Sequence, residues 1–221
     1  MKGWGWIVIA VILAIGGAAV WRMNGRISPL KDGDIVFQTV DNDQSAAVMW
    51  GTHSLYSHMG LVRETAAGPV VVEAAGSVKE TPLKTWLARG QFGRFSVYRD
   101  PDLRPHQATA LFRAARALYG RGYDLYFSFD NREIYCSELV YDAYRAAGVE
   151  LGRVQTIGDL ASAWGPAGDL LDRRALSDPQ CKARGVEGGN CTALVRERAV
   201  ITPKAIAEDS KLRRIYSNYP F

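Results

Sequence analysis

An uncharged stretch near the N-terminus constrains this chain more than any other feature, because it takes a segment out of the globular fold. Residues 3–21, GWGWIVIAVILAIGGAAVW, carry no charged side chain. A helix of that length is about long enough to cross a bilayer, which needs roughly 20 apolar residues. Trp4, Trp6 and Trp21 stand near its two ends, where indole rings favour the membrane interface.

The length of this stretch and its terminal tryptophans favour an uncleaved membrane anchor. A cleaved signal peptide is the alternative, because the small residues Gly16–Ala19 offer a cleavage point. Lys2 lies on one side and Arg22 and Arg26 on the other, so the distribution of positive charge does not decide the orientation. We expect three parts: an anchor or signal segment at 1–22, a linker at 23–31 and a globular domain at 32–221.

The composition of the chain is that of a globular protein. Hydrophobic residues make up 48% and charged residues 23%, which excludes disordered and fibrous classes. The net charge of +4 is mild and no basic run is dense, so we expect no nucleic-acid partner.

Periodicity and turn residues predict one α+β domain with an antiparallel sheet. We expect strands at 32–38, 57–64, 69–75, 95–99 and 194–201, and helices at 82–90, 104–120, from 136, at 157–164 and from 202.

The three cysteines are not equivalent. Cys181 and Cys191 bracket a polar, glycine-rich stretch, KARGVEGGN, which we expect to be a loop closed by a local disulfide in an oxidising compartment. Cys136 is then unpaired, and it is either a small buried apolar residue or a reactive thiol.

The position of Cys136 favours reactivity. It opens the helix in YCSELVYDAY and shares a helical face with Val140, Ala143, Tyr144 and Ala147. Free N–H groups and the positive end of the helix dipole stabilise a thiolate in a first helical turn. The sequence therefore predicts a cysteine nucleophile.

A thiolate nucleophile needs a histidine beside it, and the chain has three. His106 begins a surface helix, and His53 lies in a loop, where it is an exposed residue or a cleft wall. His58 lies on a strand, and Glu73 interrupts the apolar strand VVVEAA, where an unpaired charge would be costly. A hairpin that turns near Thr65 and Ala66 would place His58 opposite Glu73. The alternative is that Glu73 is an edge-strand charge.

Five sequence blocks, GDIVFQ, THSLYSHMGLV, VVEAAGSVKETPL with a following tryptophan, YDLYFSFD and YCSELVYDAY, resemble the YiiX/YebB-like hydrolases in the same order. These are circularly permuted papain-fold relatives of the NlpC cell-wall amidases and the lecithin retinol acyltransferases. The resemblance covers residues 30–152. It implies that Cys136 is the nucleophile, His58 the base and Glu73 the orienting residue.

The resemblance and the location imply a thiol hydrolase, an amidase or peptidase, of the cell envelope that acts on peptidoglycan peptides. A lipid-directed acyltransferase or esterase with the same triad is an alternative, and a catalytically silent binding module is another. Tyr123, Tyr135 and His53 are candidate substrate contacts, although such aromatic residues are more often part of a core. We expect the domain to lie outside the cytoplasm, with the membrane as a partner through residues 3–21, and we expect neither a metal nor a cofactor.

Overall fold

The computed structural model of the protein describes residues 29–129, 131–160, 173 and 177–220. The anchor or signal segment expected at residues 1–22 lies outside the described residues. The described residues from Lys31 onward belong to one compact unit. No helix among the described residues is both long and apolar enough to span a bilayer.

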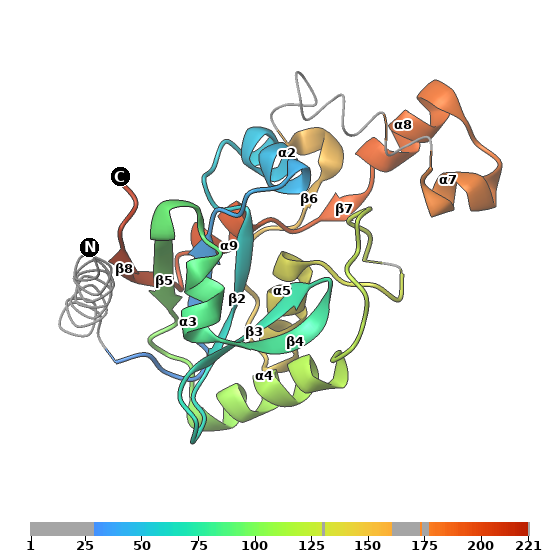
Figure 1. Ribbon diagram of the computed structural model, residues 1–221. Helices are drawn as coiled ribbons and strands as arrows, with labels where there is room; N and C mark the ends of the chain where they lie inside the picture. Colours follow the sequence, from blue (N-terminus) through green and yellow to red (C-terminus); the bar gives the residue numbers. More distant parts are fainter. Residues whose placement is uncertain (1–28, 130, 161–172, 174–176, 221) are drawn as a thin grey trace, which may run out of the picture. The chain divides into compact units, whose positions relative to one another are not determined.

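Six strands of the described residues form an antiparallel sheet in the order β4-β3-β2-β1-β5-β8 (Figure 1). Neighbouring strands pair antiparallel throughout. The strands are β1 (Ile35–Gln38), β2 (His58–Arg63), β3 (Val70–Ala75), β4 (Ser77–Pro82), β5 (Phe95–Arg99) and β8 (Arg213–Ser217). A short ladder joins β6 (Gln155–Thr156) and β7 (Ala199–Val200).

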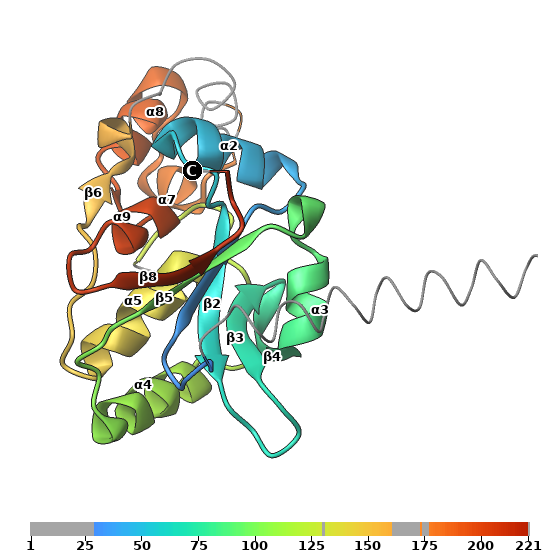
Figure 2. The same ribbon diagram turned by 90° about the vertical axis from the view of Figure 1, so that its left-hand side faces the viewer.

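Helices cover both faces of the sheet (Figure 2). The described helices are α2 (Asp43–Thr52), α3 (Leu83–Ala88), α4 (Pro105–Ala117), α5 (Cys136–Ala146), α7 (Pro179–Arg184), α8 (Gly188–Arg196) and α9 (Pro203–Ala207), with short 3-10 turns η1 (Gln91–Gly93) and η2 (Ile157–Asp159).

The core on one face is made by α4 and α5. Met59 and Leu61 of β2 pack there against Leu139 and Val140 of α5, and all four side chains are almost fully buried. Side chains alternate along a strand, so His58, Gly60 and Val62 point to the opposite face, which α3 covers. The α+β class and the antiparallel sheet expected from the sequence are confirmed.

The β2–β3 hairpin differs in register from the expected one. Leu61 pairs with Val72 and Val62 with Val71, so the turn is centred one residue later than expected. The reason is the four-residue turn of residues 65–68, which the Gly68 N–H closes by donating to the Thr65 carbonyl at 2.9 Å. The pairing shifts by two residues, and an even shift leaves every side chain on its expected face.

Position 60 of β2 lies so close to the neighbouring strand β3 that it favours a glycine. A Cβ atom at this position would lie 2.5 Å from Val71 Cγ1 and 2.8 Å from the Val72 carbonyl oxygen. The backbone oxygen cannot move aside without disturbing the sheet, so an alanine here would force a local shift of the two strands.

We therefore expect Gly60→Ala to lower the free energy of unfolding by about 1–3 kcal/mol, the usual cost of overpacking. Gly51→Ala is the matched control, because a Cβ on Gly51 of α2 meets no atom within 4 Å. Denaturant unfolding of both variants measures the difference. A Gly60→Ala protein as stable as Gly51→Ala would contradict this account of the hairpin.

The region around the paired cysteines is helical, and this corrects two expectations. The stretch KARGVEGGN is the end of α7 and the start of α8, and the disulfide between Cys181 and Cys191 joins the two helices with a Cα–Cα distance of 5.5 Å. The strand expected at 194–201 is wrong, because α8 continues to Arg196 and only Ala199–Val200 is extended. Of the helix expected at 157–164, the described part is the single 3-10 turn η2.

Candidate active site

Cys136 is the first residue of α5, as the sequence pattern predicts. Its helix begins after Tyr135, whose N–H donates to Glu138 Oε2 at 3.3 Å and so closes the first turn. The thiol is free and buried, with 3% of the residue exposed. The backbone N–H groups of the first turn have no acceptor within the helix, so they place partial positive charge beside the sulfur.

His58 and Glu73 meet on the sheet face opposite to α5. His58 Nε2 lies 2.7 Å from Glu73 Oε2, and both residues are buried. Extending the observed register places Gly60, not His58, directly opposite Glu73. The imidazole therefore reaches the carboxylate diagonally, and the glycine leaves the space between them open.

Glu73 is held by two further groups that the sequence did not point to. The Thr81 hydroxyl donates to Oε1 at 2.6 Å, and one guanidinium nitrogen of Arg89 donates to both oxygens, at 2.6 and 2.7 Å. Burial opposes ionisation of this carboxyl, but the hydrogen bonds with His58, Thr81 and Arg89 outweigh it and lower its pKa to about 2. Glu73 is therefore a carboxylate at any physiological pH.

The Cys136 sulfur reaches His58 where β2 and β3 separate. The two strands pair only from Leu61 onward, so the Met59 N–H is not taken up by β3. This N–H, the His58 side chain and the Tyr123 hydroxyl are the groups whose interactions with Cys136 lower the pKa of its thiol. Since Glu73 occupies Nε2 of His58, Nδ1 is the ring nitrogen left for the thiol.

These contacts favour an ion pair between Cys136 and His58. Burial alone would raise the pKa of the thiol, but the hydrogen bond and the charge of His58, with the Met59 N–H and Tyr123, lower it. Burial would likewise lower the pKa of His58, but its hydrogen bonds with Cys136 and Glu73 raise it to about 9. At a pH between the lowered pKa of Cys136 and the raised pKa of His58, these shifts favour a thiolate beside an imidazolium. Acyl transfer needs such a nucleophile and such a proton donor.

Trp86 of α3 covers the other side of the imidazole. The two rings stack with centroids 6.0 Å apart and an angle of 28°, and Trp86 is fully buried. This packing restricts the rotation of the His58 ring, as the hydrogen bond to Glu73 also does.

The structure separates the three candidate substrate contacts. Tyr123 is beside the thiol, and its hydroxyl also accepts a hydrogen bond from Gln44 Nε2 at 3.2 Å. Tyr135 is 1% exposed, and its hydroxyl accepts from the Ile201 N–H at 3.2 Å. Tyr135 is therefore packed in the core, and its role as a substrate contact stays a prediction that this packing does not favour.

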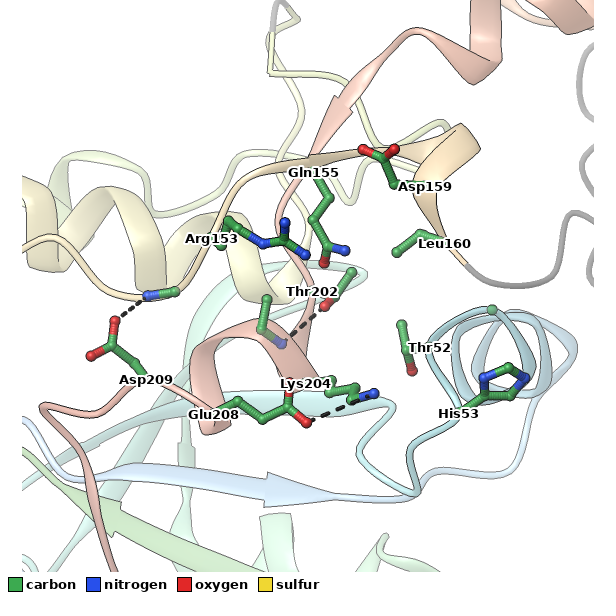
Figure 3. Close-up of a pocket in the computed structure, with 13 residues that line it drawn as sticks. Thr52, His53, Arg153, Gln155, Asp159, Leu160, Thr202, Lys204, Glu208 and Asp209 are labelled. Atoms are coloured by element: carbon green, nitrogen blue, oxygen red, sulfur yellow. Dashed lines mark hydrogen bonds and ion pairs between the residues drawn. The ribbon is translucent and has the colours of Figure 1, made fainter.

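His53 does not join the triad. It caps the C-terminus of α2 in a left-handed conformation, with φ of 49°. It lines a polar pocket of about 440 Å³ together with Arg153, Thr202 and Lys204 (Figure 3). Neither Cys136 nor His58 lines this pocket, and the contact of His53 with a substrate stays a prediction.

The chain matches known proteins over most of its length. Residues 29–216 match the family described as permuted papain-like amidase enzyme, YaeF/YiiX, C92 family. A protein of Escherichia coli strain K12, named uncharacterized protein YiiX, is 33% identical over 192 residues, which cover 85% of this chain and 87% of that protein. A crystal structure described as metalloprotein yiiX from Escherichia coli O157:H7 has a TM-score of 0.75 and 32% identity, and the match covers 86% of this chain and 98% of that one.

Proposed function

The chain belongs to the YaeF/YiiX, C92 family of permuted papain-like amidases, and from this premise we propose that it hydrolyses amide bonds through an acyl-cysteine intermediate. The observation that carries the proposal is the grouping of Cys136 with the hydrogen-bonded pair His58–Glu73, whose pKa shifts favour the charges that thiol catalysis requires.

In the proposed reaction the Cys136 thiolate attacks the carbonyl carbon of the amide. The N–H of Cys136, at the first position of α5, has no helical acceptor and is suited to bind the resulting oxyanion. The His58 imidazolium then gives its proton to the leaving nitrogen, the C–N bond breaks, and an acyl-cysteine remains. Water attacks this thioester while the neutral imidazole takes its proton, which releases the acid and restores the thiolate and the imidazolium. Glu73 holds the imidazole in place and supports its positive charge throughout.

We propose peptidoglycan peptides as the substrate class and the cell envelope as the location. The disulfide between Cys181 and Cys191 supports an oxidising compartment. The uncharged residues 3–21 support attachment to or export across a membrane. Both observations support a domain outside the cytoplasm, where peptidoglycan is found.

The proposed reaction is written with groups of this chain and water. The relative from Escherichia coli O157:H7 is described as a metalloprotein. Within the part of this chain that the structure describes, no three His, Cys, Asp or Glu side chains are grouped so that they could hold a metal ion.

Mass spectrometry of muropeptides incubated with the full-length protein tests the proposal. Cleavage of a peptide amide with the gain of one water, absent with Cys136→Ala, is the expected result. Unchanged muropeptides, with acyl transfer or ester cleavage in a membrane-lipid extract treated in parallel, would reject the peptide substrate in favour of the lipid-directed alternative. A protein inert toward both, with a Cys136 that reacts with iodoacetamide at pH 6 no faster than an ordinary thiol, would reject thiol catalysis.

A further inference from the structure

Arg89 is the residue of the site that neither the motif blocks nor the family match assigns. One of its guanidinium nitrogens lies 2.6 Å from Glu73 Oε1 and 2.7 Å from Oε2. Glu73 is fully buried, whereas the Arg89 side chain is 39% exposed. The guanidinium therefore reaches inward from the surface and forms an ion pair with Glu73, on the side of Glu73 away from Cys136 in the Cys136–His58–Glu73 series.

The backbone that carries Arg89 is fixed by its neighbours. Arg89 ends α3, and the next residue, Gly90, lies so close to β1 that a Cβ would be 2.8 Å from the Gln38 side-chain oxygen. The Gln91 N–H then donates to the Thr39 carbonyl at 2.8 Å. The turn after α3 is thus bound to the end of β1, beside the strand that carries His58.

The four side chains alternate in charge: thiolate, imidazolium, carboxylate and guanidinium. Buried charge is costly unless it is balanced nearby. Without Arg89, the single imidazolium would have to balance both the thiolate and the carboxylate. With Arg89, the carboxylate has its own cation and the imidazolium is left to the thiolate.

The other charged groups near the series do not supply this balance. Lys79 of β4 is paired with Glu73 in the sheet register but is exposed, and Lys84 of α3 is exposed as well. Among the described residues, neither makes an ion pair with Glu73. Glu138 in the first turn of α5 has a pKa raised by burial to about 8, so it adds no full negative charge at neutral pH.

We propose that Arg89 is a positioning residue of the site, whose charge balances that of Glu73 so that the His58 imidazolium is available to the Cys136 thiolate. The inference rests on the proposed thiol chemistry and adds a member to it. Arg89 acts through Glu73 and touches neither the sulfur nor the imidazole in the contacts described above.

The test is the pH dependence of Cys136 alkylation by iodoacetamide, which needs no substrate. Cys136 is the only free thiol of the chain while the disulfide is intact, so the label reports on it alone. Arg89→Gln keeps a hydrogen-bond donor for Glu73 and removes the charge. In a plot of alkylation rate against pH, we expect the inflection of this variant to lie about one pH unit above that of the wild type. At a pH below both inflections, its alkylation should be about tenfold slower. Arg89→Lys keeps the charge, and its inflection should stay near the wild-type value.

The matched control is Arg63→Gln, which removes an arginine from another surface ion pair, 2.6 Å from Glu80 and with side chains 27% and 29% exposed. It should leave the inflection in place. A shift in Arg89→Gln no larger than in Arg63→Gln would overturn the inference, even if both proteins lose stability. A wild-type inflection at the pH of an ordinary thiol would instead reject the thiolate itself and with it the proposed function.

Loss of folding in Arg89→Gln would not leave the question open. The double variant Arg89→Gln with Glu73→Gln removes both charges and leaves the thiolate and imidazolium balanced. Charge balance predicts an inflection within about half a unit of the wild type. An inflection raised by a full unit or more in this double variant would overturn the role of Arg89 in charge balance.

Discussion

Replacing Cys136 by alanine is expected to lower amide hydrolysis by about 10⁴-fold or more, the usual loss when a covalent nucleophile is removed. The covalent step has no substitute, because Cys136 is the only free cysteine and His58 bonds to no other candidate nucleophile among the contacts described. The measurement is turnover of a muropeptide that the wild-type protein cleaves, followed by mass spectrometry.

Thermal unfolding supplies the control for this variant. The side chain is small and its removal leaves a cavity in a well-packed region, so some loss of stability is expected. A folded Cys136→Ala protein that retained near-normal turnover would show that another group attacks the substrate. Cys136→Ser should be as inactive as the alanine variant, since the hydroxyl keeps the size but is not ionised beside His58.

The pairing of His58 with Glu73 could be predicted because it depends on two strong local signals. A carboxylate in an otherwise apolar strand must find a partner, and strand alternation places His58 on the same face. The error of two residues in the hairpin register did not matter, since an even shift preserves the faces. An odd shift would have separated the two side chains.

Arg89 could not be predicted in the same way. It follows a helix of six residues, and its reach to Glu73 depends on how the turn after α3 is bound to β1. That contact joins segments far apart in the sequence, and no periodicity records it. The signal that was available is the buried carboxylate itself, which indicates that a cation is needed but not which one.

The misassigned region at 181–201 shows a different limit. The glycines in KARGVEGGN favour a loop, but the disulfide and the packing of Val195 against both cysteines stabilise two short helices. Tertiary constraint here overrides local preference. The aromatic segment before Cys136 was equally undecidable, since Tyr123 contacts the thiol whereas Tyr135 is core.

Replacing His58 by glutamine is expected to slow alkylation of Cys136 at pH 6 by about 100-fold or more. Glutamine can still donate to Glu73 from its amide, but it carries no positive charge. Burial raises the pKa of the thiol, and the hydrogen bond and charge of His58 oppose it most strongly. Without them the pKa returns to about 8.5 or above, and at pH 6 the thiolate fraction falls to about 1 in 300 or less.

The pH dependence separates the two roles of His58. Its pKa is raised to about 9, so the imidazolium is present below that pH and is lost as the pH rises through it. Thiolate forms as the pH rises through the lowered pKa of Cys136. The alkylation rate of the wild type should therefore increase in that pH range and stay high above pH 9. The rate of amide hydrolysis should increase in the same pH range but decrease above about pH 9, because the leaving nitrogen then has no proton donor. Hydrolysis that continued to rise with alkylation beyond this pH would mean that His58 is not the acid, and a His58→Gln protein alkylated at the wild-type rate at pH 6 would mean that it does not form the ion pair.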